Sequence, residues 1–400
     1  MKDYEWSDES MKKALMVASV ASMIQQFNMR NLCILQELGY EVHVAANFKK
    51  GNTCSGEKIQ ALQQELEQKG IKWYQIDFDR NVMNIKADAL AYRQMLQLVK
   101  KEKYDLLHCH SPIGGVIGRL VGHRCHVYTI YTAHGFHFYK GAPKKNWLLF
   151  YPIEKFLSRY TDQLVVINKE DYELAQRKFY MKKLDYVPGV GVKTEKKMIS
   201  DEKRMQKREE FDIPEDAFLI TSVAEFTPNK NQITVLRALE QMRKENICYL
   251  MCGIGEKKEE LEQYVKEHNL SAKVRFAGFR SDVHEILQAS DCFVLSSIRE
   301  GLSVALMEAM AEGLPIVCGK IRGNVDLIED DIGGYLVEPT KTEEYKVAFM
   351  KLLQKKKNNP DELERMGINN KTVIRKFGCE PVDVRMKEIY QVTFERKQSI

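Results

Sequence analysis

Residues 297–311 read Ser-Ile-Arg-Glu-Gly-Leu-Ser-Val-Ala-Leu-Met-Glu-Ala-Met-Ala and hold two glutamates, Glu300 and Glu308, in mostly apolar surroundings. Glu300 adjoins a glycine after an apolar run that predicts a buried strand, and Glu308 lies in the first turns of a predicted helix. A helix N-terminus favours negative charge beside it, and carboxylates accept strong hydrogen bonds from hydroxyl groups. The stretch therefore indicates a site that holds hydroxyl groups at a strand-to-helix turn.

The rest of the chain alternates strand and helix patterns in two series. The first series predicts strands at 14–19, 41–46, 72–76, 106–109, 127–132 and 162–167, and helices at 26–38, 56–69, 87–102 and 113–124. The second predicts strands at 218–223, 248–252, 273–276, 292–295 and 315–318, and helices at 231–244, 257–268 and 303–312. Such alternation is typical of an α/β fold whose parallel sheets are covered on both faces.

The alternation breaks near residue 190, where Pro188-Gly189 leaves a strand and a charged stretch, residues 193–210, follows. The 400 residues exceed the usual size of one core, so two domains are expected. We predict two Rossmann-like domains, residues 1–190 and 191–381, that face each other across a cleft. A last helix within residues 382–400 is expected to complete the first domain. Ligands in such sheets bind outside the carboxyl ends of the strands.

Composition narrows the class of protein. A charged fraction of 29% and a net charge of +5 are ordinary for a soluble protein and do not indicate a nucleic-acid partner. No apolar run reaches the roughly 18 residues of a membrane span. Residues 14–22 imitate a signal peptide, but the acidic residues before them and the helical pattern after them favour a buried strand. The nine cysteines lack metal-like spacing, which favours reduced thiols in a cytoplasmic protein.

Four polar loops follow strands of the second series and would share one sheet edge: 225–231, 253–256, 278–283 and 300–308. Gly253 and Gly255 would let the backbone approach a ligand closely. Lys230 begins a helix and suits a phosphate group. Phe279 would stack on a base. Each loop alone is also compatible with an ordinary turn.

Histidines gather near strand ends of the first series. His110 and His134 each follow a predicted strand, so both would adjoin one cleft, and His137 comes two residues after His134. We interpret His134 as the strongest functional candidate. Metal binding is not expected, because no carboxylate accompanies the histidines at ligand spacing.

Motifs from both halves carry a family resemblance. The matching segments are Glu300…Glu308, Gly313-Leu-Pro315, Asn229-Lys-Asn231, Gly278–Val283, His108–Gly115, Thr132–His137 and Ile167–Asp171. Together they resemble family 4 glycosyltransferases of GT-B fold, in the branch that makes bacterial capsular polysaccharides and exopolysaccharides. The resemblance spans residues 12–390. It implies a retaining, nucleotide-sugar-dependent hexosyltransferase that needs no metal at the chemical step and no resident cofactor.

The resemblance also implies roles for the matching residues. Glu300 would contact the donor sugar, Lys230 the diphosphate, and His134 the donor sugar and the acceptor; these three are the predicted catalytic residues. Further donor contacts are predicted for Glu308, Gly301, Ser303, Val304, Gly253, Gly255, Phe279 and Arg280. Acceptor or cleft contacts are predicted for His110, His137 and Ser19.

Two departures from the family pattern bear on the donor site. Ala224-Glu225 replaces a common Gly-Arg before the phosphate lysine, so one cationic phosphate contact is missing or replaced. Arg322 and Arg299 are the two candidate replacements. Residues 19–28 replace a common Gly-Gly, which puts the acceptor or diphosphate contact of that loop in doubt.

Residues 137–156 mix lysines with aromatic residues and leucines, a pattern typical of an interfacial element; a core helix with a lysine rim is the alternative. The predicted acceptor is a polyprenyl-diphosphate-linked or other saccharide, with the enzyme peripheral on an anionic inner membrane face.

Two other functions stay open: a UDP-sugar epimerase of the same architecture, and a non-catalytic partner subunit that binds nucleotide sugar. The Glu300…Glu308 spacing argues against the first, and the intact Lys230 and His134 argue against the second.

Overall fold

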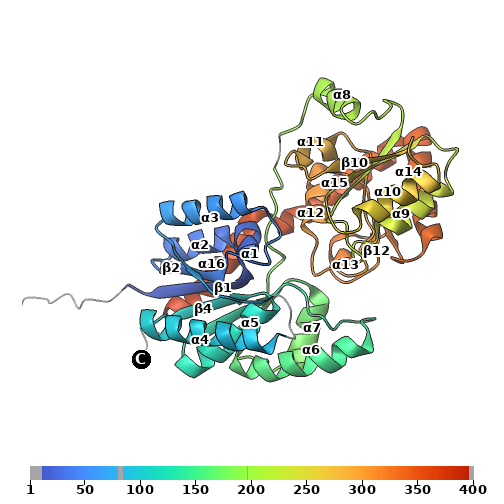
Figure 1. Ribbon diagram of the computed structural model, residues 1–400. Coiled ribbons are helices and arrows are strands. Elements are labelled where there is room, and N and C mark those ends of the chain that lie inside the picture. Colours follow the sequence, from blue (N-terminus) through green and yellow to red (C-terminus); the bar gives the residue numbers. More distant parts are fainter. Residues whose placement is uncertain (1–10, 80–83, 196, 396–400) are drawn as a thin grey trace, which may run out of the picture. The chain divides into compact units, whose positions relative to one another are not determined.

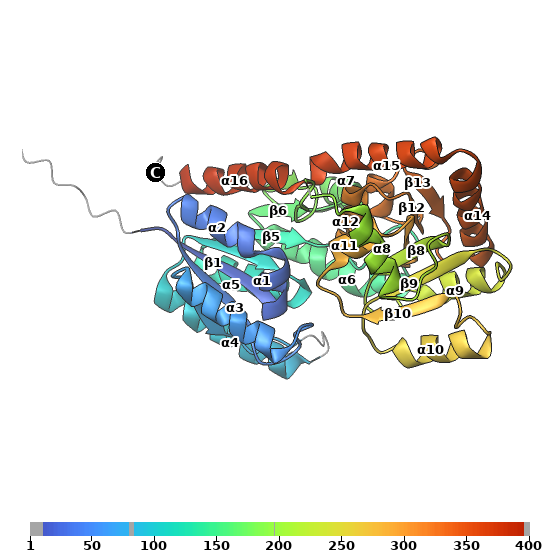
Figure 2. The same cartoon turned by 90° about the horizontal axis from the view of Figure 1, so that it is seen from above.

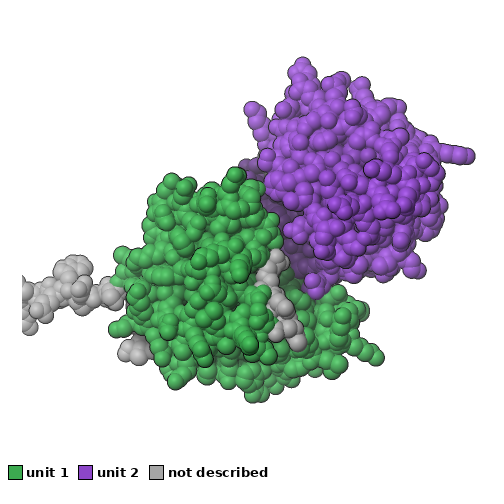
Figure 3. All heavy atoms as spheres, viewed as in Figure 1, with its two compact units in different colours: residues 1–190, 382–400 green, residues 191–381 purple. Residues whose placement is uncertain are grey.

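The computed structural model describes residues 11–79, 84–195 and 197–395. The chain divides into two compact units, residues 1–190 with 382–400 and residues 191–381, which Figure 3 colours separately. Each unit contains one parallel sheet with helices packed on it (Figure 1). The predicted α/β class with two Rossmann-like sheets is confirmed. The cleft between the domains stays a prediction.

The sheet of the first unit has the order β3-β2-β1-β4-β5-β6-β7, and its paired strands are parallel. Its strands are β1 (Lys13–Val20), β2 (Glu41–Asn47), β3 (Lys72–Gln75), β4 (Leu106–His110), β5 (Tyr128–Ala133), β6 (Gln163–Val166) and β7 (Lys183–Tyr186). The strand order reverses between β1 and β4, the point at which such sheets bind ligands. Side chains of β1 alternate between two cores, with Met16 in one and Leu15 and Val17 in the other.

The helices of this unit are α1 (Ala21–Phe27), α2 (Met29–Glu37), α3 (Gly56–Gln68), α4 (Ile85–Glu102), α5 (Pro112–Cys125), α6 (Lys144–Leu157), α7 (Lys169–Lys178) and α16 (Cys379–Glu395). The prediction of a single helix at 26–38 is wrong, because helical structure is interrupted at Asn28, between the end of α1 and the start of α2. Asn28 Nδ2 donates to the Met23 carbonyl at 3.2 Å, and Asn28 Oδ1 accepts from Asn31 at 3.1 Å. Such local side-chain bonds compete with helical pairing.

The C-terminal helix α16 belongs to the core of the first unit from Val382 onward. Met386, Ile389 and Tyr390 lie in the same apolar cluster as Met16 of β1. In Figure 2, α16 runs beside α2, and an Arg30–Asp383 ion pair joins the two helices. The chain end therefore buries one face of the first sheet.

The second unit has the strand order β10-β9-β8-β11-β12-β13, with the reversal between β8 and β11. Its strands are β8 (Phe218–Val223), β9 (Ile247–Cys252), β10 (Val274–Gly278), β11 (Cys292–Leu295), β12 (Ile316–Gly319) and β13 (Gly334–Val337). Its helices are α8 (Asp201–Glu209), α9 (Gln232–Glu240), α10 (Lys258–Glu267), α11 (Val283–Gln288), α12 (Val304–Glu312), α13 (Asn324–Leu327), α14 (Thr342–Asn358) and α15 (Pro360–Ile374). The charged stretch at 193–210, expected as a break, contains α8.

Two further expectations concern cysteines and membrane spans. All nine cysteines lie in the described part of the chain and are free thiols. Among the described residues, no helix combines the length and the apolar character that crossing a bilayer requires.

Candidate functional site

The loop after β8 and the loop after β11 bring Lys230 and Glu300 into contact. Lys230 Nζ lies 2.7 Å from Glu300 Oε1, and their side chains are 24% and 12% exposed. β8 and β11 are neighbours at the reversal of strand order, so their carboxyl-end loops meet. The two residues predicted to act together in the second half of the chain therefore form an ion pair at the expected sheet edge.

The asparagines on either side of Lys230 fix its loop. Asn229 Nδ2 donates to the Arg299 carbonyl at 3.0 Å, and Asn231 Nδ2 donates to the Ser296 carbonyl at 3.2 Å. Ser296 Oγ donates back to the Lys230 carbonyl at 2.8 Å. Asn231 has φ of +53°, a left-handed conformation that asparagine tolerates better than most residues. These bonds hold the lysine in place before any ligand arrives.

Helix α12 begins beside this pair. Its N-cap, Ser303, accepts a hydrogen bond from the Leu306 amide at 3.3 Å. Val304 and Glu308, one turn apart, lie on the less buried face of the helix, whereas Leu306 and Met307 are fully buried. Because Val304 and Glu308 are four residues apart, Glu308 lies on the same face of α12 as Val304, the first residue of the helix.

Gly253 and Gly255 are required by close backbone packing. A Cβ on Gly253 would lie 1.9 Å from the Ala224 carbonyl oxygen, and a Cβ on Gly255 would lie 2.4 Å from the Phe226 oxygen. The loops after β8 and β9 therefore touch through these two positions. Packing explains both glycines, and their contact with a donor stays a prediction.

Arg280 and Phe279, both predicted to contact the base of the donor nucleotide, differ in their surroundings. Arg280 Nε donates to Asp282 at 2.7 Å, and its Nη2 donates to Glu210 at 2.7 Å. The hydrogen bond from Arg280, and after it one from Lys207, lower the pKa of the Asp282 carboxyl. The Phe279 ring is 63% exposed. Arg280 is thus engaged by two carboxylates of its own unit, and a base contact by either residue stays a prediction.

Of the two arginines considered as replacements for the missing cationic phosphate contact, Arg322 contacts the loop that contains Glu300. Its Nε donates to the Glu300 carbonyl at 3.2 Å, and the residue is only 6% exposed. The next residue, Gly323, has φ of +82°, and a Cβ there would lie 2.3 Å from the Gly301 oxygen. The turn after β12 therefore packs on the Glu300-Gly301 turn and places Arg322 beside the Glu300 backbone. A phosphate contact by Arg322 or Arg299 stays a prediction.

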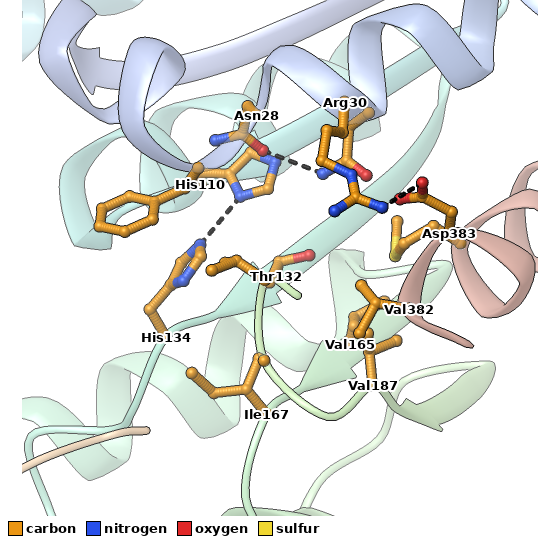
Figure 4. Close-up of a pocket in the computed structure, with 15 residues that line it drawn as sticks. Asn28, Arg30, His110, Thr132, His134, Val165, Ile167, Val187, Val382 and Asp383 are labelled. Carbon is orange, nitrogen blue, oxygen red and sulfur yellow. Dashed lines mark hydrogen bonds and ion pairs between the residues drawn. The ribbon is translucent and has the colours of Figure 1, made fainter. Parts of the chain in front are cut away.

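In the first unit, His110 and His134 point toward each other from the ends of β4 and β5 (Figure 4). His110 Nδ1 lies 3.1 Å from His134 Nε2, and His110 Nε2 lies 3.1 Å from the sulfur of Met16. A thioether has no proton to donate, so His110 Nε2 carries the proton and His110 Nδ1 accepts from His134. His134 Nδ1 is then left as a hydrogen-bond acceptor.

Burial keeps both histidines neutral. It lowers the pKa of His134 to about 4, and, together with the neighbouring histidines, it lowers the pKa of His110 well below the ordinary value. At neutral pH the pair therefore presents an uncharged acceptor nitrogen, suited to a hydroxyl group.

His108 and His137 have different surroundings. His108 is buried and bonds Tyr390 Oη and Thr132 Oγ1, both at 2.7 Å, so it ties α16 to the first sheet. The His137 ring packs on Phe150 with centroids 4.6 Å apart.

Ser19, His134 and His137 line a single cavity of about 500 Å³. His110 does not reach it; this histidine is buried and, with His134, borders a hollow of about 20 Å³. Ser19 is held by a hydrogen bond from its amide to Ser111 Oγ at 2.9 Å. The structure therefore brings three of the four first-half candidates to one cavity and places His110 behind it.

Sequence reasoning missed Asp88, Tyr131 and Glu154, which also line this cavity. Glu154 lies in the segment interpreted as interfacial, yet it is buried and accepts from Arg119 Nη1 at 2.8 Å. No local pattern reveals such a pair, because its members lie 35 positions apart on different helices. Within the described residues, no three His, Cys, Asp or Glu side chains are grouped as metal ligands.

Comparisons with known proteins cover both units. The family described as "Glycosyl transferases group 1" matches residues 203–373, and "Glycosyl transferase 4-like" matches residues 17–168. The chain is 33% identical over 388 residues to the putative glycosyltransferase EpsD of Bacillus subtilis (strain 168), covering 95% of this chain and 96% of that protein. It is 30% identical over 285 residues to the UDP-Gal:alpha-D-GlcNAc-diphosphoundecaprenol alpha-1,3-galactosyltransferase of Escherichia coli, covering 69% and 73%.

Solved structures share the fold. The structure of Anabaena Alr3699/HepE in complex with UDP and glucose superposes with a TM-score of 0.76 at 17% identity, covering 96% of this chain and 100% of that one. The lipopolysaccharide glycosyltransferase WaaG superposes with a TM-score of 0.69 at 16% identity, covering 94% and 98%.

Proposed function

We propose a donor and an acceptor for this chain from one premise: it belongs to the family 4 glycosyltransferases, which have the GT-B fold. Its relatives include glycosyltransferases named for the biosynthesis of lipopolysaccharide core, colanic acid and amylovoran. The proposed reaction transfers a hexose from a UDP-sugar, with retention of configuration, to a lipid-linked saccharide.

The Lys230–Glu300 pair is the observation that carries the proposal. Breaking the sugar–phosphate bond leaves negative charge on the diphosphate, and fixed cations and helix N-terminal amides stabilise such charge. Lys230, held 2.7 Å from Glu300, and the start of α12 at Ser303 supply these groups. Glu300 then accepts hydrogen bonds from the donor sugar rather than acting as an acid or base.

Two named proteins support the substrates. The Escherichia coli relative is named for UDP-Gal and a diphosphoundecaprenol acceptor, and the Anabaena structure holds UDP and glucose. For this chain we propose a UDP-sugar as substrate rather than cofactor, with charge neutralisation by side chains and amides instead of a metal. We propose that the acceptor attacks the donor sugar from the same face that the diphosphate leaves. Attack from that face retains the configuration at the anomeric carbon.

The proposal is tested by turnover. Wild-type protein is incubated with UDP-glucose, UDP-galactose, UDP-GlcNAc or UDP-GalNAc and a panel of sugar-diphospho-undecyl acceptors. We expect acceptor-dependent release of UDP from one of these donors and, as the control, no release of GDP from GDP-mannose. Absence of UDP release from every donor would contradict the function.

A membrane surface is the proposed location of the acceptor. Helix α6 exposes an apolar face formed by Leu148, 80% exposed, with Leu149, Ile153 and Phe156, and Lys144 and Lys145 begin the helix. An apolar face bordered by lysines binds the interface of an anionic bilayer. We therefore place the enzyme peripherally on the cytoplasmic leaflet.

Vesicle flotation measures this binding. Wild-type protein should float with phosphatidylglycerol-containing vesicles, and the Lys144→Gln/Lys145→Gln variant should float less. Lys257→Gln/Lys258→Gln, which neutralises an adjacent pair on the other unit, should behave as wild type. Equal flotation of all three proteins, or none with any vesicle, would argue against the membrane proposal.

A further inference from the structure

Helix α11 is tied to its surroundings by two side chains, His284 and Gln288, which are four residues apart and so share one face of the helix. α11 packs on α8 and α12 (Figure 2). Both side chains reach Glu312, the last residue of α12, and the carbonyl of Lys197, which precedes α8. These groups, here called the His284 cluster, join three segments of the second unit.

The amide of Gln288 is fully used within the His284 cluster. Its Nε2 donates to Glu312 Oε2 at 2.9 Å and to the Lys197 carbonyl at 3.2 Å, and a primary amide has two N–H donors. Gln288 Oε1 accepts from the Ile199 amide at 2.8 Å. The contact between His284 and Glu312 therefore needs a proton of its own.

The His284 ring meets an acceptor at each nitrogen. Nε2 lies 3.0 Å from the Lys197 carbonyl oxygen, and Nδ1 lies 2.6 Å from Glu312 Oε1. A carbonyl only accepts, so Nε2 carries a proton, and a neutral imidazole has no second one. The 2.6 Å contact is therefore a hydrogen bond only while one further proton is held, as imidazolium with carboxylate or as imidazole with carboxylic acid.

Loss of that proton leaves a buried carboxylate oxygen against a nitrogen lone pair, which is destabilising. The Glu312 side chain is only 1% exposed, whereas His284 is partly exposed and lets the proton exchange with solvent. On α11 itself, Glu285 is paired with Lys203 and Lys207 of α8. The cavity of about 840 Å³ that Glu312 lines has five further charged side chains: Lys193, Glu195, Lys371, Arg375 and Glu380.

The His284 cluster adjoins two segments with predicted donor contacts. Glu312 follows Glu308 by four residues and Val304 by eight, so the three share one face of α12. His284 directly follows Val283, the end of the 278–283 loop that contains the residues predicted to contact the base. The bond between His284 and Glu312 thus sets how α12 lies against this loop.

We propose that His284 and Glu312 are positioning residues for the donor site and that one shared proton keeps them joined. The link to the UDP-sugar rests on the proposed function. With the proton, α12 and the 278–283 loop are held together; without it, the two side chains separate and donor binding weakens. Because the joined form binds the additional proton, it is favoured at lower pH and lost as the pH rises.

The inference is tested by the pH dependence of Glu312→Gln. The glutamine nitrogen donates to His284 Nδ1 and its oxygen accepts from Gln288, so the link no longer needs a dissociable proton. Between about pH 6.5 and about pH 9, the wild-type KM for the UDP-sugar should rise at least about fivefold; one linked proton allows up to about tenfold per pH unit. The KM of Glu312→Gln should change less than about twofold over the same range.

Glu240→Gln is the matched control, because Glu240 and His268 form another, partly exposed pair in the same unit, 3.0 Å apart. Its pH profile should follow that of the wild type. His284→Ala removes the link altogether, so it should raise the UDP-sugar KM at every pH and abolish the pH dependence.

Hydrogen exchange tests the link without turnover. Amides of residues 197–201 and 283–288, corrected for the intrinsic effect of pH, should exchange faster in the wild type as the pH rises, but not in Glu312→Gln. A wild-type KM that does not depend on pH, or the same dependence in wild type and Glu312→Gln, would overturn the inference. Failure of every donor to release UDP overturns the proposed function instead, and the exchange rates still show whether a proton joins the two side chains.

Discussion

Replacing Lys230 with alanine is expected to lower kcat for sugar transfer on the order of a hundredfold or more, as loss of one charge-stabilising donor does in other active sites. Lys230 Nζ is 2.7 Å from Glu300 Oε1, and its loop is fixed by bonds from both flanking asparagines. Its removal takes away the cation proposed for the leaving diphosphate. It also leaves the largely buried Glu300 carboxylate without its ion-pair partner.

The matched control for this variant is Lys257→Ala. Lys257 pairs with Glu260 on the exposed surface of the same unit, and exposed pairs contribute little to stability. Initial rates and thermal melts of both variants should show a loss of activity in Lys230→Ala alone, with both proteins folded. Near wild-type turnover by folded Lys230→Ala would remove Lys230 from the mechanism.

Glu300→Ala is expected to lower kcat/KM by more than about tenfold, a loss of more than about 1.4 kcal/mol. The carboxylate is proposed to bind the donor sugar, and it also positions Lys230. Groups in direct contact are not independent, so the Lys230→Ala/Glu300→Ala double variant should lose less than the product of the two single effects.

The control for this second prediction is Glu260→Ala, which removes a carboxylate from the exposed pair. Rates measured over a range of donor concentrations show whether the loss lies in donor binding or in turnover. Multiplicative losses in the double variant would show that the two residues act separately and that the ion pair has no functional meaning.

Strands were the most predictable part of the fold, because buried parallel strands are short continuous apolar runs. β1 shows why: both of its faces, Met16 on one side and Leu15 on the other, pack in cores. The break at Asn28 was not predictable from apolar spacing, since the apolar pattern continues across it and side-chain bonds to Met23 and Asn31 interrupt the helix. Helix α6 was ambiguous because its apolar side chains face both inward and outward.

The residues of the candidate site in the two units also differed in how far the sequence could predict them. The loops of Lys230 and Glu300 were predictable as members of one sheet edge, because each follows a strand of the second series. The strand order of the structure then shows that these two strands adjoin. Asp88 and Glu154 were not predictable, because they come from helices whose relation to β5 only the tertiary structure defines. Arg322 needed the packing of Gly323 on Gly301 before its place beside Glu300 could be seen.

The most direct measurement of the central claim is the identity of the product made by the wild-type protein from a UDP-sugar and a sugar-diphospho-undecyl acceptor. We predict by mass spectrometry an acceptor heavier by one sugar, and by NMR an α-linkage that retains the configuration of the donor, with UDP released in equal amount. Epimerised UDP-sugar formed without acceptor, or UDP-sugar bound and never turned over, would contradict the account.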